Sequence, residues 1–416
     1  MGPPFFLKDI QPDAGTTYQE LSRYDSPRVH TERVHSFSLC AMKPPKTSDL
    51  IGIINQIAPP GLAEKWDNCG LQVGDPRQEV TRIMVSLEAT EAVLDAAVTA
   101  GCNLLVTHHP LIFKPLSSIT TATCQGRLIH KAIASGISII SMHTSFDAAD
   151  GGLNDILAER IGLVDTRPLR RQPPEELTKL VVFVPASHLE TVRDALLPWG
   201  EVLGAYRDCS FATPGEGTFT PQAGAEPFTG TVGTRECVAE QRLELLVNRN
   251  ALARAIKALT AAHPYEEPAF DIYPLLNEGK AAGLGRIGTL AAPRPLADFA
   301  KQVSDQLAVP ALRYTGDPAA KIRTVALCSG SGASLLRDAV RAGADVLVTG
   351  DVKFHDARDA QDMGICLVDA GHFQTEIIMA EAVADLLRER LSAAGWVDTP
   401  VEACRAESDP FCHVTH

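Results

Sequence analysis

An internal repeat places the strongest limit on the fold of this chain. Residues 97–107 read AVTAGCNLLVT and residues 339–349 read AVRAGADVLVT, so that seven of the eleven positions are identical. Both copies have the pattern of a helix end, a glycine that stops the helix and a short apolar strand. Two such units, far apart in one chain, indicate a pseudo-symmetric α/β core that arose by duplication.

Helical and strand-like segments alternate around both copies of the repeat, and this order favours parallel strands joined by crossover helices. In the first half we expect strands at 82–87, 103–107 and 137–142, and helices at about 90–100 and 126–135. In the second half we expect strands at 324–328, 345–349 and 365–368, and a helix that ends near residue 342.

The chain between the two halves has a different pattern. Residues 167–174 are rich in Pro and Arg and have the composition of a linker. The order β-α-β followed by β-α-β is typical of a ferredoxin-like α+β domain, so we expect such a domain, inserted into the α/β core. Its elements would be strands at 179–185, 242–247 and 269–274, helices at 188–197 and 251–262, and a loop or hairpin at 211–228.

These patterns divide the chain into five parts. The first convincing helix begins near Ser48, because apolar residues recur at helical spacing from Leu50 to Ile57. The parts that we expect are a poorly ordered extension at 1–45, the first half of the α/β core at 46–170, the inserted domain at 171–283, the second half of the core at 284–396, and a C-terminal tail at 397–416.

Charge and cysteine content narrow the setting in which the protein works. The net charge of −13 makes nucleic acid an unlikely partner. No apolar run approaches the roughly 18 residues that a membrane-spanning helix needs, and the N-terminus lacks the pattern of a signal peptide, so no membrane association is expected. The ten cysteines include no C-x-x-C pair, which fits a reducing compartment, and we expect a cytoplasmic protein.

Polar side chains follow the predicted parallel strands in both halves of the chain. His108 and His109 follow one buried strand, Asp147 follows the next, and His372 and Glu376 follow the strand at 365–368. The carboxyl ends of parallel strands meet at one edge of a sheet, which is where such sheets hold ligands. A lone histidine after a strand is usually structural, but a His-His pair and matching residues in both halves favour a metal site.

Three histidines, one aspartate and one glutamate form a mixed nitrogen and oxygen ligand set. One open catalytic ion typically uses three protein ligands, so five ligands suit two ions about 3.5–4 Å apart that share a carboxylate. The ligand types do not identify the metal, because imidazole suits Zn, Fe, Ni and Co while carboxylates also suit Mn and Mg.

Several motifs together resemble the dinuclear-metal-centre hexameric family, which is related to yeast NGG-one-interacting factor three and known as GTP cyclohydrolase I type 2 homologues. The resemblance covers about residues 46–395. The motifs are Trp66-Asp67-Asn68-Cys69-Gly70-Leu71-Gln72-Val73-Gly74, Thr107-His108-His109-Pro110, His143-Thr144-Ser145-Phe146-Asp147, Gly371-His372 with Glu376, and, for the inserted domain of longer members, His263-Pro264-Tyr265-Glu266-Glu267-Pro268.

The resemblance implies a toroidal homohexamer whose metal pairs face an internal cavity. It implies two divalent ions per subunit, Zn, Fe, Mn, Ni or Co, with His108 and His109 on different ions and Glu376 as the bridging ligand. Asp147 and His372 complete the implied ligand set. Cys69 stands where serine is common in the family; a packed small residue is the simpler interpretation, and a catalytic thiol is the alternative.

Further motifs permit more than one interpretation. The loop after the strand at 345–349 carries Lys353 and His355, which we expect to join Glu376 as catalytic groups, Lys353 on a substrate phosphate and His355 as an acid or base; a solvated loop is the alternative. Residues 330–332 (Gly-Ser-Gly) fit either an anion site or a tight turn. Residues 283–288 match a dinucleotide fingerprint, but no helix pattern follows them, so we reject that site. Around His263, prolines favour a rigid turn over a second metal site.

The function that we expect is a metal-dependent hydrolase in which a metal-bound hydroxide attacks a small nucleotide-like or phosphorylated substrate. GTP cyclohydrolase activity is what the family resemblance implies, although no residue pattern requires a guanine pocket. The alternative is a non-catalytic metal-binding hexamer that acts as a scaffold or binds a regulatory partner.

Overall fold

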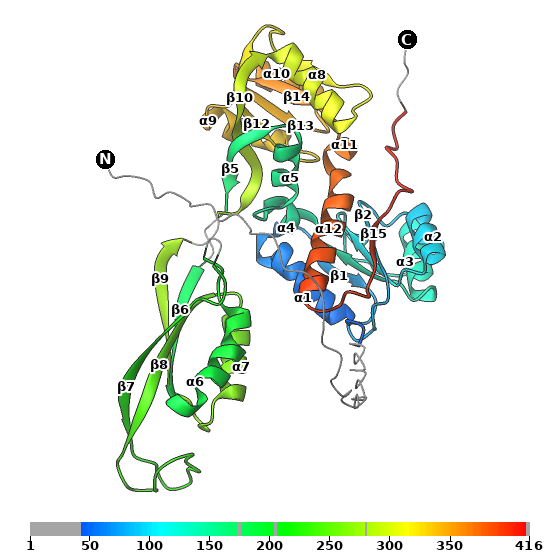
Figure 1. Cartoon of the computed structure of the whole chain (residues 1–416). Coiled ribbons are helices and arrows are strands. Elements are labelled where there is room, and N and C mark those ends of the chain that lie inside the picture. Colours follow the sequence, from blue (N-terminus) through cyan, green and yellow to red (C-terminus); the bar gives the residue numbers. More distant parts are fainter. Residues whose placement is uncertain (1–42, 173–175, 204–205, 279–280, 413–416) are drawn as a thin grey trace, which may run out of the picture. The chain divides into compact units, whose positions relative to one another are not determined.

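A computed structural model describes residues 43–172, 176–203, 206–278 and 281–412 (Figure 1). The extension predicted for residues 1–45 therefore lies, except for residues 43–45, outside the described residues. In the described part of the chain, no helix has both the length and the apolar character that crossing a membrane requires.

The first half of the chain supplies four strands of a five-stranded sheet in which parallel strands are central, as the alternating pattern predicts, and the C-terminal end supplies the fifth. Every residue of β2, β3 and β4 is buried, which explains why these segments are continuously apolar or small in the sequence. The spatial order is β1 (Gly70–Val73), β4 (Ser138–Ser141), β3 (Leu104–Thr107), β2 (Ile83–Ser86) and β15 (Val401–Ala403).

Helices cover both faces of this sheet because successive strand residues point to opposite sides. Leu104 and Val106 of β3 belong to a core with two helices, and Leu105 belongs to a core with two others. The helices of the first core are α1 (Thr47–Ile57) and α12 (Ile378–Ala393), and those of the second are α2 (Glu91–Ala100) and α3 (Cys124–Ala134).

The second half supplies five strands of a six-stranded mixed sheet, three of them parallel (β12, β13 and β14), and β5 at the end of the first half supplies the sixth. The order is β11 (Arg313–Thr315), β14 (Cys366–Asp369), β13 (Val346–Thr349), β12 (Lys321–Leu327), β10 (Gly283–Pro295) and β5 (Leu163–Arg171). One face packs on α5 (Leu153–Arg160) and α8 (Leu296–Leu307), and the other on α9 (Leu336–Arg341) and α10 (Phe354–Asp362).

Two predictions about connecting segments are wrong. Residues 167–171, expected to be a linker, belong to β5, which pairs antiparallel with β10 at the edge of the sheet. An edge strand tolerates proline, and here Pro168 sits opposite Arg286. Residues 401–403, expected to be part of a tail, form β15 and pair parallel with β2.

Helices are exchanged between the two halves. Helix α12 follows the second sheet in sequence, but its residues Met379, Val383 and Leu387 lie in the core of the first sheet. Helix α5 precedes the second sheet, and Leu157 and Ile161 at its end lie in that sheet's core. Each half therefore needs the other to complete its hydrophobic core.

The segment between β5 and β10 forms an antiparallel four-stranded sheet, and two helices pack on one face of it. Its chain order is strand, helix, strand, strand, helix, strand, and the spatial order of the strands is β7-β8-β6-β9. The elements are β6 (Glu176–Pro185), α6 (Leu189–Leu196), β7 (Ser210–Phe219), β8 (Glu236–Asn248), α7 (Leu252–Ala262) and β9 (Phe270–Glu278).

Short helices complete the fold, and two of them matter for the site. Both begin directly after a parallel strand: α4 (His143–Ala148) after β4, and α11 (His372–Glu376) after β14. The remaining single-turn helices are η1 (Pro60–Leu62), η2 (Ala186–His188), η3 (Leu197–Trp199) and η4 (Ala333–Leu335).

Candidate metal centre

The loops that follow three parallel strands bring the predicted ligands together. His108 and His109 follow β3, Asp147 lies on α4, and His372 and Glu376 begin and end α11. The chain turns into α11 through Gly371, whose positive φ of 80° suits glycine, and a Cβ there would lie 2.3 Å from Gln374 Oε1. His108 and Glu376, 268 positions apart in the sequence, thus share one site.

Glu376 lies between two groups of side chains and turns one carboxylate oxygen toward each. Its Oε2 is 3.0 Å from His109 Nε2 and 2.9 Å from His372 Nε2. Its Oε1 is 3.8 Å from His108 Nε2. His108 Nε2 is also 3.7 Å from Asp147 Oδ1.

The spacing of these atoms fits coordination of cations. Bonds of about 2.0–2.2 Å to one ion place two ligand atoms roughly 3–3.5 Å apart. His109 Nε2 and His372 Nε2 are 3.5 Å apart, so these two imidazoles and Glu376 Oε2 could hold one ion with little movement. A wider group surrounds His108 Nε2, with Asp147 Oδ1 at 3.7 Å and Glu376 Oε1 at 3.8 Å, and a second ion there would need these side chains to move inward.

His108 supplies an independent test of the fit. Its side chain is fully buried, and neither ring nitrogen has a hydrogen-bond partner among the described residues. A buried imidazole without partners is costly, and a cation at Nε2 would remove the part of that cost that comes from Nε2. The residues present therefore suit a metal site on chemical grounds.

Two further carboxylates contact the His109 and His372 rings at Nδ1, on the side away from Glu376. Glu88 Oε1 lies 3.0 Å from His109 Nδ1, and Asp351 Oδ2 lies 2.7 Å from His372 Nδ1. A carboxylate beside Nδ1 favours a proton on that nitrogen and leaves Nε2 as an acceptor toward the centre. Such carboxylate–histidine pairs are the usual outer support of metal-binding histidines.

His143 is a site residue that the sequence interpretation did not assign. Its ring lies 5.2 Å from the His108 ring and 5.4 Å from the His109 ring, and the three histidines offer nitrogens close enough to share an ion. Asp67 Oδ1 lies 2.9 Å from its Nδ1. The repeat contained a signal for it, because His143 and Asp147 are spaced as His372 and Glu376 are, each pair on a helix after a parallel strand.

Electrostatic interactions show that this site stabilises positive charge. Burial lowers the pKa of His109, but the Glu376 and Glu88 carboxylates outweigh burial and raise it to about 10. Glu376, with Asp351, raises the pKa of His372 to about 9 against burial. Burial would raise the pKa of Glu376, but the histidines facing it hold that pKa well below its usual range.

The pKa values of Asp147 and Asp67 shift in opposite directions, although burial acts to raise both. Burial raises the pKa of Asp147, although His108 opposes the shift, and Ser329 Oγ lies 3.1 Å from its Oδ1. Burial also acts to raise the pKa of Asp67, but hydrogen bonds from His143 and Thr144 outweigh it and hold the pKa far below its usual value. Asp67 is thus a stable anion that orients His143.

The structure does not bring Lys353 and His355 into this cluster. Both side chains are exposed, at and just inside the start of α10, and no contact between them and the clustered ligands occurs within the described residues. The residue of that loop that reaches the centre is Asp351, whose φ of 55° turns the chain sharply before α10.

Other predicted motifs have structural roles. The Gly330 and Gly332 amides donate to Thr375 and Thr349, which favours the tight-turn interpretation over an anion site. Residues 283–288 lie in strand β10, not at a strand-to-helix turn. His263 is buried and engages Phe183 O and the Tyr265 amide, as expected for a rigid turn. Cys69 contacts Asp67 and Ser145, and burial raises its pKa to about 11, which argues against a reactive thiol.

Comparison with known proteins gives consistent matches over almost the whole described chain. The family model described as Duf34/NIF3 (NGG1p interacting factor 3) matches residues 45–410. A protein of Halalkalibacterium halodurans named GTP cyclohydrolase 1 type 2 homolog is 41% identical over 374 residues, which are 90% of this chain and 100% of that protein. A Bacillus subtilis protein of the same name is 41% identical over 335 residues, 80% of this chain and 90% of its own length.

A solved structure agrees with these sequence matches. The crystal structure of a Bacillus cereus protein related to NIF3 superposes with a TM-score of 0.78 at 39% identity, covering 90% of this chain and 100% of that one.

Proposed function

Because this chain belongs to the DUF34/NIF3 family, as its motifs predict, we propose that it holds two divalent metal ions and hydrolyses a small nucleotide-like or phosphorylated substrate. The name that its relatives carry, GTP cyclohydrolase 1 type 2 homolog, supports a hydrolase of that kind. The proposed ligands are His108, His109, Asp147, His372 and Glu376.

The position of Glu376 is the observation that carries this proposal. Its two oxygens face separate nitrogen donors, His108 on one side and His109 with His372 on the other. A buried carboxylate placed in this way is suited to bridge two cations.

The residues around this centre each contribute a definite role. When bound, a pair of divalent cations would supply Lewis acidity and a water molecule of lowered pKa. Glu88 and Asp351 fix the rings of His109 and His372, so that their Nε2 atoms face Glu376. Asp67 holds the Nδ1 proton of His143, whose Nε2 is then free to bind an ion or accept a proton from substrate.

Lys353 and His355 have a smaller part in the proposal than the sequence suggested. Their exposure leaves them available to a substrate at the rim, Lys353 for a phosphate and His355 for proton transfer. His143 is the better placed acid or base, since its ring contacts those of His108 and His109.

A non-catalytic metal-binding scaffold is the competing function. Its supporting observation is that the site is closely packed: the exposed fraction of the side chain is 5% for Glu376 and 13% for Asp147. Ligands that saturate both ions would leave no position for substrate.

The finer architecture is also part of the proposal. Matching β12-β13-β14 and β2-β3-β4 triplets, each flanked by an antiparallel strand beside its last member, support a duplicated core. The β7-β8-β6-β9 order supports a ferredoxin-like insertion. The proposal of a toroidal homohexamer rests on the family resemblance alone. A cytoplasmic location is supported by the cysteines: the nine in the described residues are all free thiols.

Turnover by metal-loaded protein tests the proposal directly. Purified chain loaded separately with Mn, Fe or Zn would be incubated with nucleotides, phosphoesters and cyclic amides, while elemental analysis gives ions per subunit. Metal-dependent turnover that disappears in Glu376→Gln supports the hydrolase. Two bound ions without turnover of any compound support the scaffold, and protein that binds no ion contradicts both.

Two further variants control this experiment. His109→Ala should lower the metal content while the circular dichroism spectrum stays unchanged, because the ring is partly exposed and its loss removes a ligand rather than core volume. Glu389→Gln on α12, an exposed carboxylate elsewhere, should leave metal content and turnover unchanged. Unchanged metal stoichiometry in His109→Ala would contradict the ligand assignment.

A further inference from the structure

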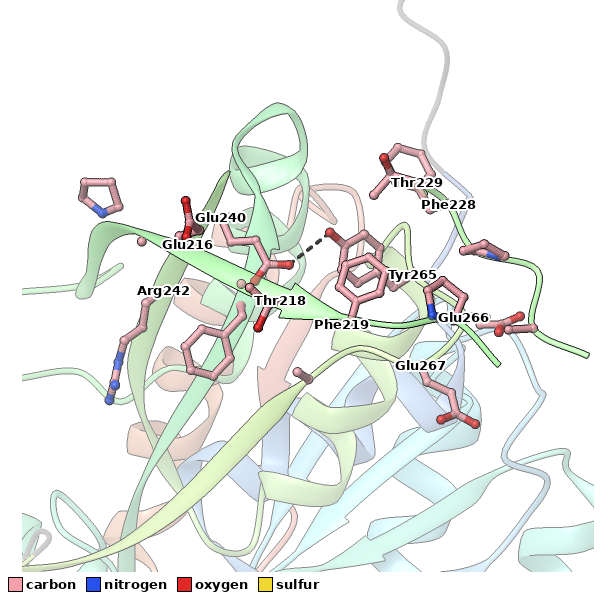
Figure 2. Close-up of a pocket in the computed structure, with 18 of the residues that line it drawn as sticks. Glu216, Thr218, Phe219, Phe228, Thr229, Glu240, Arg242, Tyr265, Glu266 and Glu267 are labelled. Carbon is pink, nitrogen blue, oxygen red and sulfur yellow. Dashed lines mark hydrogen bonds between the residues drawn. The ribbon is translucent and has the colours of Figure 1, made fainter. Parts of the chain in front are cut away.

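A cavity of about 560 Å³ lies in the inserted segment, and none of the proposed metal ligands lines it. It is formed by the β7–β8 hairpin, the loop that joins these strands and the turn before β9 (Figure 2). This volume is within the roughly 300–1,000 Å³ of small-molecule sites.

Aromatic rings form one wall of the cavity. The Tyr265 ring lies 6.1 Å from the Phe219 ring and 6.0 Å from the Phe228 ring, tilted by 59° and 42°. Figure 2 shows these three side chains gathered at the same end of the site. The faces of aromatic rings carry partial negative charge and attract cations.

A buried carboxylate lies beside this aromatic wall. Glu240 is only 9% exposed, and its Oε1 accepts a hydrogen bond of 3.0 Å from the Tyr265 hydroxyl. Among the described residues, that hydroxyl is the one hydrogen-bond donor to the Glu240 carboxylate. A carboxylate with so little solvent and a single neutral donor is poorly compensated, so a cation beside it would be stabilised.

Gly217 makes the space that the Glu240 carboxylate occupies. A Cβ at this position would lie 2.2 Å from Glu240 Oε2, which is far inside the contact distance of the two atoms. The carboxylate therefore keeps its place beside the cavity only because residue 217 has no side chain.

The remaining charged groups around the cavity add to its negative character. Glu216, Glu266 and Glu267 are exposed carboxylates at its edge. Arg242 is the single basic residue of the lining, and its guanidinium is already engaged, with Nε 2.8 Å from Glu244 Oε1 and Cζ 5.9 Å from the Phe183 ring centroid. The lining thus contains four carboxylates and one arginine, and that arginine is already paired with Glu244.

From this arrangement we propose that the cavity is a binding site for a small organic ammonium ion. Its charge would lie between the Glu240 carboxylate and the faces of Tyr265, Phe219 and Phe228, and its alkyl groups would cover the rings. Aromatic groups combined with a carboxylate are a recurrent means of binding quaternary and alkylated ammonium groups. This site is independent of the metal centre and of its proposed reaction.

A pair of ligands that differ in charge but not in shape tests the proposal. Choline and its neutral carbon analogue 3,3-dimethylbutan-1-ol would each be titrated into the full chain by calorimetry, with tetramethylammonium as a third probe. We expect choline and tetramethylammonium to bind, and the neutral alcohol to bind at least about tenfold more weakly, which corresponds to about 1.4 kcal/mol.

Variants locate the binding and separate it from folding. Glu240→Gln keeps the size of the side chain and should weaken choline binding about tenfold, and Phe228→Ala, at a half-exposed ring, should weaken it severalfold. Glu190→Gln on α6 is the matched charge control, and His109→Ala is the control for the metal centre; both should bind choline as the unaltered chain does.

Three results would each overturn the proposal. They are no binding of either ammonium probe in the millimolar range, equal binding of choline and its neutral analogue, and unchanged choline affinity in Glu240→Gln. Thermal unfolding of each variant shows whether it is folded, and Gly217→Ala provides a second route to the same answer, because it should displace the carboxylate and weaken choline binding.

Discussion

Glu376 has its position because a glycine lies against it. Gly330, in the turn after β12, has a φ of 56°, and a Cβ built there would lie 2.1 Å from Glu376 Oε1 and 3.3 Å from His372 Nε2. The absence of a side chain at residue 330 therefore allows the Glu376 carboxylate to lie between the histidines.

Gly330→Ala should reduce metal binding without unfolding the protein. The added methyl group would displace the Glu376 carboxylate. Elemental analysis should therefore find fewer ions per subunit in the variant than in the unaltered protein. Gly343→Ala is the matched control, because Gly343 also has a positive φ, 76°, but has nothing within 4 Å of its Cβ position. Equal metal loss in both variants would indicate backbone strain rather than displacement of Glu376.

Cys69 should behave as a packed small residue. With a pKa of about 11, only about one thiol in a thousand is ionised at pH 8, and the thiolate is the reactive form. In a timed iodoacetamide reaction followed by peptide mass spectrometry, we expect Cys69 to react far more slowly than exposed Cys124 at pH 8. The rate should rise as the pH approaches 11. Comparable rates at pH 8 would restore the catalytic-thiol interpretation.

At the scale of elements, a buried ion pair joins strand β10 to helix α5. Arg286 is 1% exposed; its Nε and Nη2 donate to the two Asp155 oxygens at 2.6 and 2.7 Å. The same guanidinium donates to the carbonyl oxygens of Gly283, Gly285 and Ala149. The arginine therefore satisfies three backbone acceptors as well as a carboxylate, at the place where the second sheet receives a helix from the first half.

Arg286→Met should strongly destabilise the fold. The substitution removes the cationic partner of Asp155 and one donor from each of three carbonyl groups, while the Gly151 amide still donates to Asp155 and the Gly152 amide to Ala149 O. The expected loss in the free energy of unfolding is about 3 kcal/mol. Urea denaturation measures it. In the exposed i,i+4 pair Lys301–Asp305, Lys301→Met should cost less than about 1 kcal/mol. A similar small cost for both variants would show that the buried pair contributes little.

At the scale of the whole molecule, each α/β half lacks a complete core of its own. The first sheet is covered by α12 from the end of the chain, and the second by α5 from the first half. The candidate ligands follow the same division: His108, His109 and Asp147 follow strands of the first sheet, and His372 and Glu376 lie on α11. Folding of the two halves and assembly of the candidate metal centre are therefore coupled.

The homohexamer implied by the family resemblance is testable in solution. Light scattering at micromolar concentration should give a mass six times the 44.6 kDa of the chain. The ring should form in both the metal-loaded and the Glu376→Gln protein, since the ligands lie inside the subunit. A mass of one subunit would contradict both the hexamer and the shared internal cavity.

The sequence predicted local features well because their causes are local. The buried strands, the end of a helix at Gly101 and the donor types of the five candidate ligands follow from periodicity and side-chain chemistry. Residues 167–171 were mistaken for a linker because the partner strand β10 lies more than a hundred residues away, and no local pattern records that pairing. His143 was not assigned to the site for a related reason: the residues around its ring, His108, His109 and Asp67, come from distant parts of the chain.

By itself, the sequence determined most of the helices and strands of the two parallel sheets and the donor atoms available to a metal, but not the edge strands β5 and β15. The tertiary structure decided which donors meet: that one oxygen of Glu376 faces His108 and the other faces His109 and His372, that Asp351 rather than Lys353 or His355 reaches the centre, and that the halves exchange helices. These outcomes depend on contacts between residues distant in the chain, and such contacts are fixed by packing of whole sheets and helices rather than by neighbouring residues.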